Sequence, residues 1–266
     1  MRIIAVTALI AMLGVMGQGV SVSVNVFVQD GNIPVAGLKA SDFALTDNGA
    51  NQIIDSATVD RRSVDVTLLV DVNEAMPLTV DQLTRRIGSI ARAFAIDDRI
   101  RVITFGADVA LTVPLQPATR PLPVGRIADA GRSSLNAAIL YALMRPAEPN
   151  RRHLVVASTT GRDTEQLLGT DQLSAVATRS DGVLVVLLTR PAYTSLGELI
   201  RATGGAIYSL NGDFAPAFDG ILENFKGGYL VEWTPQRVKR EGWHELKVTV
   251  PKFKKYTVRT RKGYMG

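Results

Sequence analysis

Valine occupies every even position from Val20 to Val28, and the odd positions up to Gln29 are polar apart from Phe27. A period of two predicts a half-buried β-strand. Asp47-Asn48-Gly49 is a strong hairpin-turn signal, and residues 52–59 can form the returning strand. Residues 20–62 are therefore predicted to be rich in β-structure.

The pattern changes after Arg61-Arg62. Residues 64–70 form a nearly continuous apolar run that ends in Asp71, and apolar residues then recur at helical spacing from Leu78 to Ala95. Apolar runs and helical segments continue to alternate as far as Phe225. Strands that are apolar on both faces, alternating with helices, predict an α/β domain over residues 63–225. We expect a doubly wound, mainly parallel, Rossmann-like sheet with helices on both sides.

Residues 226–266 return to the alternating pattern of β-strands. The two flanks, 20–62 and 226–266, are each too small to fold well alone. We therefore expect them to pair into one small discontinuous β-rich domain, as a single sheet or a sandwich.

The formal net charge of +5 is concentrated near the C-terminus, because residues 237–262 hold ten Lys and Arg against Glu241 and Glu245. We call six of these basic residues the basic ribbon: Lys252, Lys254, Lys255, Arg259, Arg261 and Lys262. One interpretation is a solvated strand whose lysines protect an exposed edge. The alternative is a surface that binds an anionic envelope polymer; nucleic acid is not expected as a partner of an exported protein.

Residues 1–19 have the pattern of a secretory signal peptide. Arg2 precedes an apolar run from Ile3 to Met16, which is shorter than the roughly 20 residues that cross a bilayer, and small residues follow. We expect an exported protein that is periplasmic, on the cell surface or secreted. The alternative, an uncleaved N-terminal anchor, is the only route by which we expect membrane contact. The chain has no cysteine, which excludes a lipoprotein anchor, disulfides and a thiol nucleophile.

Sequence motifs of the common enzyme classes are missing. The chain has no Gly-x-Ser-x-Gly elbow, Walker A loop or Gly-x-Gly-x-x-Gly after its first α/β strand. Its two histidines, His153 and His244, are predicted on strands, and His244-Glu245 lacks the second histidine of a zinc protease. We therefore expect no enzymatic activity.

A strand that ends in aspartate before a loop and a helix places a carboxylate at the carboxyl edge of the sheet, where open α/β sheets bind ligands. The segment 64–71, residues 97–106, the Ser133 loop and the segment ending at Thr164 together resemble a von Willebrand factor A-type (VWA) domain. The flanks are similar to those of a VWA-related subfamily of exported acidobacterial proteins. This resemblance covers nearly all of the chain after residue 19, and it implies a fold and a protein-binding role.

VWA domains hold a divalent cation in a metal-ion-dependent adhesion site (MIDAS), built from Asp-x-Ser-x-Ser, a Thr and a later Asp. By this resemblance Asp71 is retained, Asn73 and Ala75 replace the two serines, Ser133 takes the Thr position and Thr160 takes the second Asp position. Magnesium prefers octahedral oxygen ligands that include carboxylates. The site is therefore expected to be degenerate, and no cofactor is expected.

The leading hypothesis is an exported, non-enzymatic protein-interaction module. Its binding surface would be the metal-free rim formed by Asp71, Asn73, Glu74, Ser133 and Thr160, and its protein partner is not identified by the sequence. The first alternative is a metal-dependent adhesion-type binder that holds Mg or Mn through Asp71, Asn73 and Ser133. The second is an envelope scaffold that binds through the basic ribbon.

Overall fold

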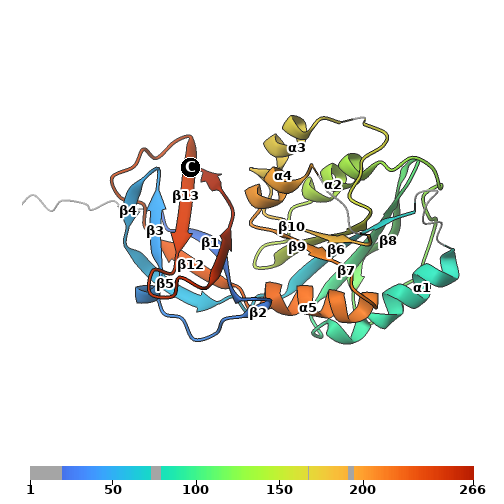
Figure 1. Ribbon diagram of the computed structural model, residues 1–266, viewed down its shortest axis with the longest axis horizontal. Coiled ribbons are helices and arrows are strands. Elements are labelled where there is room, and N and C mark those ends of the chain that lie inside the picture. Colours follow the sequence, from blue (N-terminus) through green and yellow to red (C-terminus); the bar gives the residue numbers. More distant parts are fainter. Residues whose placement is uncertain (1–19, 73–78, 167, 191–194) are drawn as a thin grey trace, which may run out of the picture.

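The computed structural model describes residues 20–72, 79–166, 168–190 and 195–266, and these form two lobes along the long axis of the molecule (Figure 1). The β lobe contains residues 20–59 and 229–266, and the α/β lobe contains the described residues between them. The expected signal peptide, residues 1–19, lies outside the described part. In the described ranges no helix is long and apolar enough to cross a membrane.

The β lobe contains two sheets. One has the strand order β14-β1-β12-β5, with β2 also paired to β1, and the other has the order β15-β13-β3-β4. The elements of this lobe are β1 (Val22–Asp30), β2 (Ile33–Pro34), η1 (Ala40–Asp42), β3 (Ala44–Asp47), β4 (Ala50–Gln52), β5 (Ile54–Val59), β12 (Tyr229–Trp233), β13 (Trp243–Thr249), β14 (Thr257–Thr260) and β15 (Gly263–Met265).

Strands from both ends of the sequence pair with one another in the β lobe. The N-terminal strand β1 lies antiparallel between the C-terminal strands β12 and β14, and β13 pairs with β3. Alternate residues of these strands, such as Val26, Trp233 and Leu246, form one apolar cluster. The alternation seen in the sequence therefore separates a buried face from an exposed face.

The α/β lobe contains one six-stranded sheet in the order β11-β10-β9-β6-β7-β8. Five strands are parallel and the edge strand β8 is antiparallel to β7, so the sheet is mixed. The elements are β6 (Val64–Asp71), α1 (Val80–Ser89), η2 (Ala91–Ala93), β7 (Arg99–Phe105), β8 (Val109–Pro117), α2 (Leu135–Leu143), β9 (Arg152–Thr159), α3 (Thr170–Ala177), β10 (Val183–Leu188), α4 (Gly197–Ala202), β11 (Ala206–Ser209) and α5 (Phe214–Lys226).

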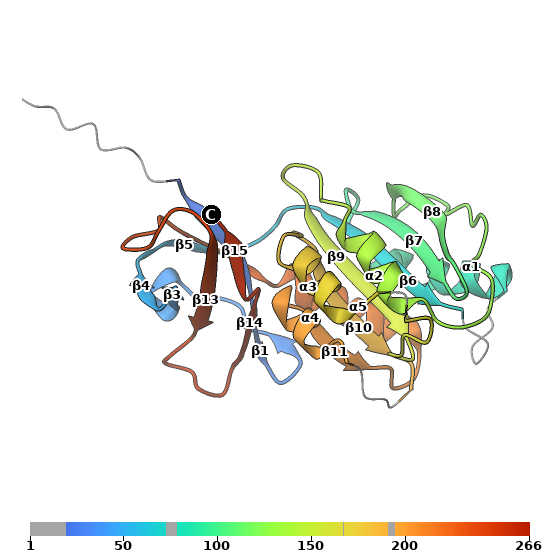
Figure 2. The same cartoon turned by 90° about the horizontal axis from the view of Figure 1, so that it is seen from above.

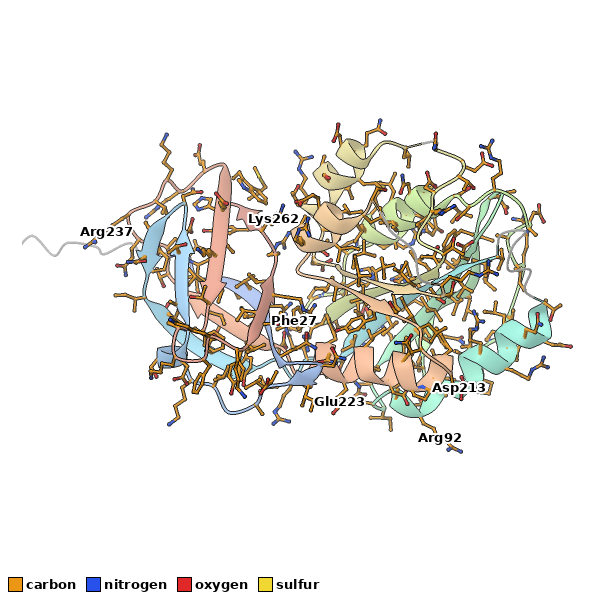
Figure 3. The ribbon with its side chains drawn as sticks, viewed as in Figure 1. Phe27, Arg92, Asp213, Glu223, Arg237 and Lys262 are labelled. Atoms are coloured by element: carbon orange, nitrogen blue, oxygen red, sulfur yellow. The ribbon has the colours of Figure 1, made fainter. Side chains whose placement is uncertain are left out.

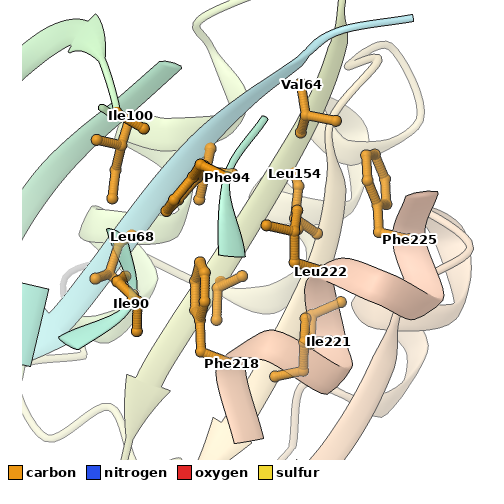
Figure 4. Close-up of a cluster of buried hydrophobic side chains, with 14 of the residues drawn as sticks. Val64, Leu68, Ile90, Phe94, Ile100, Leu154, Phe218, Ile221, Leu222 and Phe225 are labelled. Atoms are coloured by element: carbon orange, nitrogen blue, oxygen red, sulfur yellow. The ribbon is translucent and has the colours of Figure 1, made fainter. Parts of the chain in front are cut away.

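Helices cover both faces of this sheet, which confirms the α/β fold expected from the sequence. Helices α1 and α5 lie on one face, and α2, α3 and α4 lie on the other (Figures 1 and 2). Every residue of β6, β9 and β10 is buried, because both faces of these central strands meet a helical layer. On the α5 side, Leu68 and Leu154 of the sheet pack with Phe218 and Leu222 of the helix (Figure 4).

The chain passes between the lobes twice, and a buried arginine holds both crossings together. The guanidinium of Arg152, at the start of β9, donates to the carbonyl oxygens of Asp60 (2.9 Å) and Phe225 (2.6 Å). Its Nε lies 3.3 Å from Asp60 Oδ2, and both side chains are almost inaccessible to solvent. Asp60 immediately follows β5, while Phe225 lies near the end of α5 and also stacks on Phe27 of β1.

Replacing this arginine should strongly destabilise the protein. We expect Arg152→Met to lower the free energy of unfolding by about 3–5 kcal/mol, because it leaves two buried carbonyl oxygens without a donor and removes one of the two arginines beside the buried carboxylate of Asp60. Urea unfolding followed by circular dichroism would measure the change. Arg92→Met, at an exposed arginine of η2 (Figure 3), is the matched control and should change stability by less than about 0.5 kcal/mol. Equal effects of the two substitutions would contradict this role of Arg152.

The histidine next to Arg152 is also buried in the sheet. His153 is 2% exposed, and its Nε2 lies 2.8 Å from the hydroxyl oxygen of Thr67 on β6. Burial lowers the pKa of His153 from 6.5 to about 4, although Asp181 opposes the shift. Below its ordinary pKa the unfolded chain therefore takes up a proton that the folded protein does not bind.

Stability should consequently fall as the pH decreases from about 6.5 towards 4, with a loss of about 2 kcal/mol at pH 5 attributable to His153. The variant His153→Gln keeps a neutral polar side chain beside Thr67 but does not titrate. Urea unfolding at a series of pH values should show a shallower decline for the variant over this window. Parallel curves for the wild type and His153→Gln would rule out this histidine as the source.

Candidate functional site

The carboxyl ends of β6 and β9 lie side by side because these two strands are parallel neighbours. Val70 pairs with Ser158, so the next residues, Asp71 and Thr159, end their strands at the same edge of the sheet. Open α/β sheets bind ligands at this edge. Asp71 therefore occupies the position that the sequence pattern indicates.

The carboxylate of Asp71 is buried and receives two hydroxyl groups. Thr159 Oγ1 donates to Asp71 Oδ2 at 2.7 Å, and Ser133 Oγ donates to the same oxygen at 3.4 Å. Asp71 is 2% exposed and Thr159 is fully buried. The Thr159 hydroxyl also accepts a hydrogen bond from the amide of Gly161 at 3.1 Å, which holds the loop after β9 close to its strand.

The Ser133 loop is fixed by the loop after β9. The amides of Thr164 and Glu165 donate to the carbonyl oxygen of Ser133 (2.9 and 3.1 Å), and the Ser133 amide donates to Thr164 Oγ1 (2.6 Å). On the other side, the amide and hydroxyl of Ser134 both donate to the carbonyl oxygen of Gly106. These bonds set the position of Ser133 against Asp71.

The carboxylate of Asp163 binds backbone amides. Its Oδ1 accepts from the amide of Asn136 (3.2 Å), in the first turn of α2, and its Oδ2 accepts from the amide of Gln166 (3.1 Å). A carboxylate at this position satisfies amides that have no partner within the helix. Asp163 is therefore used to hold the start of α2 and the loop that follows β9.

The structure brings together Asp71 and Ser133 of the expected rim, whereas Asn73 and Glu74 lie outside the described residues. Thr160 is half-buried in the loop after β9. The hydroxyl that reaches Asp71 from this strand belongs to Thr159, one residue before the position expected. Ser133 is 3% exposed, so its side chain serves the carboxylate rather than the surface.

A wide hollow of about 680 Å³ lies beside these loops. Among the residues that line it are Arg132, Asn136, Gly161, Arg162, Asp163 and Thr164. The side chain of Arg132 is 71% exposed and lies 3.9 Å from Glu165, and Arg162 is also exposed. Among the described residues, the accessible polar groups at this edge of the sheet are therefore mainly those of the two loops around the hollow.

The six residues of the basic ribbon do not share one surface. Lys252 lies 3.3 Å from Asp42, Lys255 pairs with Asp30, and Lys262 pairs with Glu198 of the α/β lobe. The lysine and Arg201 lower the pKa of the exposed Glu198 to about 2. In Figure 3, Lys262 lies on the side of the β lobe that faces the α/β lobe.

The two arginines of the basic ribbon are directed towards the α/β lobe. Arg259 donates to Gln29 Oε1 (2.9 Å) and to the carbonyl oxygen of Gly204, and burial lowers its pKa. Arg261 donates through Nη2 to the carbonyl oxygens of Thr178 (2.7 Å) and Ser180 (3.1 Å). The hydrogen bonds of these two arginines hold the lobes together. Among the four lysines of the basic ribbon, Lys254 is exposed and has no ion pair within the described residues.

Proteins of known structure are similar to this chain in fold. No family model and no curated protein matches the sequence. Among solved structures, a von Willebrand factor type A protein from Catenulispora acidiphila is similar over 88% of this chain and 71% of its own, with a TM-score of 0.50 and 9% identity. The α/β lobe is therefore a VWA-type domain by fold.

Two further similar structures align with only part of this chain. An aerotolerance-related membrane protein from Bacteroides fragilis matches 61% of this chain and 98% of its own, with a TM-score of 0.45 and 16% identity. Proximal thread matrix protein 1 from the mussel byssus, solved with a zinc-occupied MIDAS motif, matches 65% of this chain and 48% of its own, with a TM-score of 0.47 and 15% identity.

Sequence reasoning missed Thr159, whose hydroxyl donates to Asp71 Oδ2 at 2.7 Å. Ser158 and Thr159 follow the apolar run of residues 154–157 and end strand β9. Hydroxyl groups at the end of a buried strand indicate the carboxyl edge of the sheet. They indicate a contact with Asp71 only when β9 is known to lie next to β6.

Removing the Thr159 hydroxyl should destabilise the loops around Asp71. We expect Thr159→Val to lower the free energy of unfolding by about 1–3 kcal/mol, because a buried carboxylate loses a donor and the Gly161 amide loses its acceptor. Thr58→Val, on an exposed position of β5, makes the same change away from the site and should leave stability nearly unchanged. Urea unfolding measures both variants; a loss no larger for Thr159→Val than for Thr58→Val would refute the contact.

Proposed function

We propose that this chain is a non-enzymatic, VWA-type protein-interaction module with a degenerate MIDAS. The proposal rests on the hydrogen bonds of the Asp71 carboxylate, whose Oδ2 accepts from the hydroxyls of Thr159 and Ser133. The carboxylate serves here to hold two loops in place. Those loops surround the hollow at the carboxyl edge of the sheet.

The donor groups that the described residues bring to Asp71 do not suit a magnesium ion. A divalent cation of this kind prefers several oxygen ligands that include carboxylates, at about 2.0–2.1 Å. Within the described residues no cluster of three or more acidic or histidine side chains could hold a metal. Thr160 places a neutral side chain where the VWA pattern has its second aspartate, and Asp163 is bonded to the amides of Asn136 and Gln166.

The partner surface would be the exposed part of the same loops rather than the buried triad of Asp71, Ser133 and Thr159. Arg132 and Arg162 are the exposed cations beside the hollow, and Thr160 lies in the same loop as Arg162. A firmly bonded loop loses little conformational entropy on binding, which favours recognition. The arginines suit a protein partner with acidic groups on its surface.

We further propose that residues 20–62 and 226–266 form one discontinuous β-rich domain into which the VWA-type domain is inserted. The pairing of β1 with β12 and β14, and the shared apolar cluster, support this division. We also propose that the protein acts outside the cytoplasm, on the basis of the signal-peptide pattern of residues 1–19.

The experiment that tests the proposal compares metal dependence with partner binding. Calorimetric titration of the wild type with MnCl₂ should show no binding up to millimolar concentrations. The triple variant Asn73→Ser, Ala75→Ser and Thr160→Asp, which restores the VWA pattern, should gain binding in the micromolar range. A partner captured from envelope extracts should be retained in EDTA and lost with Arg132→Glu and Arg162→Glu.

Two controls make the result specific. Arg92→Glu and Arg179→Glu reverse two exposed charges away from the hollow, and they should leave capture unchanged. Micromolar manganese binding by the wild type, abolished by Asp71→Ala, would replace the proposal with the metal-dependent adhesion-type binder. Capture that survives charge reversal at the hollow would move the recognition surface elsewhere.

A further inference from the structure

Arg101 is a buried arginine without a counter-charge of its own. It lies on β7, on the same face of the sheet as Ile103 of the apolar cluster under α2, and it is 9% exposed. Its Nε is buried without a partner, and no acceptor within the described residues is bonded to its guanidinium. Burial lowers the pKa of Arg101, and the positive charge of Arg145 lowers it further. A charge removed from water is costly unless an opposite charge accompanies it.

The carboxylate of Asp65 acts on Arg101 but is already bound by two other arginines. Asp65 Oδ1 accepts from Arg99 Nε (2.9 Å) and from Arg151 Nε (2.7 Å), and its Oδ2 accepts from Arg99 Nη2 (2.6 Å). Glu148 lies on the same arginine, since its Oε1 accepts from Arg99 Nη1 at 2.9 Å. Both carboxylates therefore have arginine partners, and neither is bonded to Arg101.

Arg145, just after α2, is a second arginine that has no ion pair within the described chain. Its guanidinium carbon lies 3.6 Å from the centre of the Tyr141 ring, and its Nη1 donates to the carbonyl oxygen of Tyr141 at 3.2 Å. These contacts satisfy one carbonyl at the end of the helix and hold the guanidinium in place. The remaining N–H groups of Arg145 can still donate to an acceptor from outside the chain.

The sheet is open beside α2 on this face. Leu111 of β8 pairs with Ile103, so its side chain is on the same face as Arg101, and it is 44% exposed. In Figure 2, β7 and β8 lie beside α2 rather than beneath it. The segment that follows β8 packs on the opposite face through Leu122 and Val124. An exposed apolar side chain and two arginines without ion pairs therefore share one face of the sheet.

We propose that Arg101, Arg145 and Leu111 form a docking surface for an acidic peptide segment of a partner protein, in which glutamate or aspartate alternates with apolar residues. A carboxylate of the segment supplies the counter-charge that Arg101 lacks, because a guanidinium binds a carboxylate through two parallel N–H···O bonds. A neighbouring apolar side chain of the segment covers Leu111. Arg101 lies near the start of β7, so this surface is separate from the hollow at the carboxyl edge of the sheet.

The test uses the full chain and a fluorescein-labelled peptide of alternating glutamate and leucine as the probe. Fluorescence anisotropy at low ionic strength should show binding with a Kd below about 100 μM. The same peptide with glutamine in place of glutamate should not bind. Failure of the wild type to bind the acidic peptide, or equal binding of the two peptides, would overturn the proposal.

Arg101→Met separates a binding role from a structural role. The variant keeps an unbranched apolar side chain, and peptide affinity should fall at least about tenfold, because a charge-assisted hydrogen-bonded pair is lost. Without peptide, its melting temperature should equal or exceed that of the wild type, since a buried charge without a partner is removed. A lower melting temperature for Arg101→Met would identify a structural arginine and contradict the proposal.

Leu111→Glu places a carboxylate on the proposed surface without altering a buried side chain, and it should also reduce affinity at least about tenfold. Ile207→Glu is the matched control, because Ile207 is likewise 44% exposed and lies on β11, the other edge strand of the same sheet. It should bind the peptide as the wild type does. Arg132→Glu with Arg162→Glu should also leave binding unchanged. Loss of binding in that double variant, with retention in Leu111→Glu, would assign the peptide to the hollow instead.

Discussion

The buried guanidinium of Arg152 is the constraint on which the arrangement of the two lobes depends. The VWA-type part of the chain leaves the β lobe at Asp60 and returns to it after Phe225. Arg152 donates to the carbonyl oxygens of both residues, and its own strand, β9, lies at the centre of the sheet. A single side chain thus joins both crossing points to the most buried layer of the α/β lobe.

This arrangement gives the two edges of the sheet different tasks. The starts of β9, β10 and β11 face the β lobe, where Arg152, Ser180 and Gly204 form hydrogen bonds across the boundary. The carboxyl ends of β6 and β9 point away from it, and there Asp71 and its hydroxyl partners shape the loops. The β lobe covers one edge, and it does not cover the other.

Much of the fold could be predicted from the sequence because its signals are local. The apolar run from Val64 to Val70 identifies a strand buried on both faces, and the following Asp71 identifies its carboxyl end. The contact between Thr159 and Asp71 could not be predicted this way, since it depends on which strand lies beside β6. The contacts of Arg259 and Arg261 with the α/β lobe could not be predicted either, because the number of basic residues in a segment does not show which face of a strand meets another lobe.

The degenerate MIDAS that we propose rests on a general property of hydroxyl groups, which can donate a hydrogen bond to a carboxylate and also accept one from an amide. In a metal site, oxygen lone pairs point at the cation and the loops are held through it. Here Thr159 and Ser133 donate hydrogen atoms to Asp71 instead, so direct hydrogen bonds hold the loops. Position 160 holds a threonine, so no carboxylate at that position repels the buried carboxylate of Asp71. The hydrogen bonds to Asp71 therefore hold these loops, and the recognition that we propose at this edge needs no bound ion.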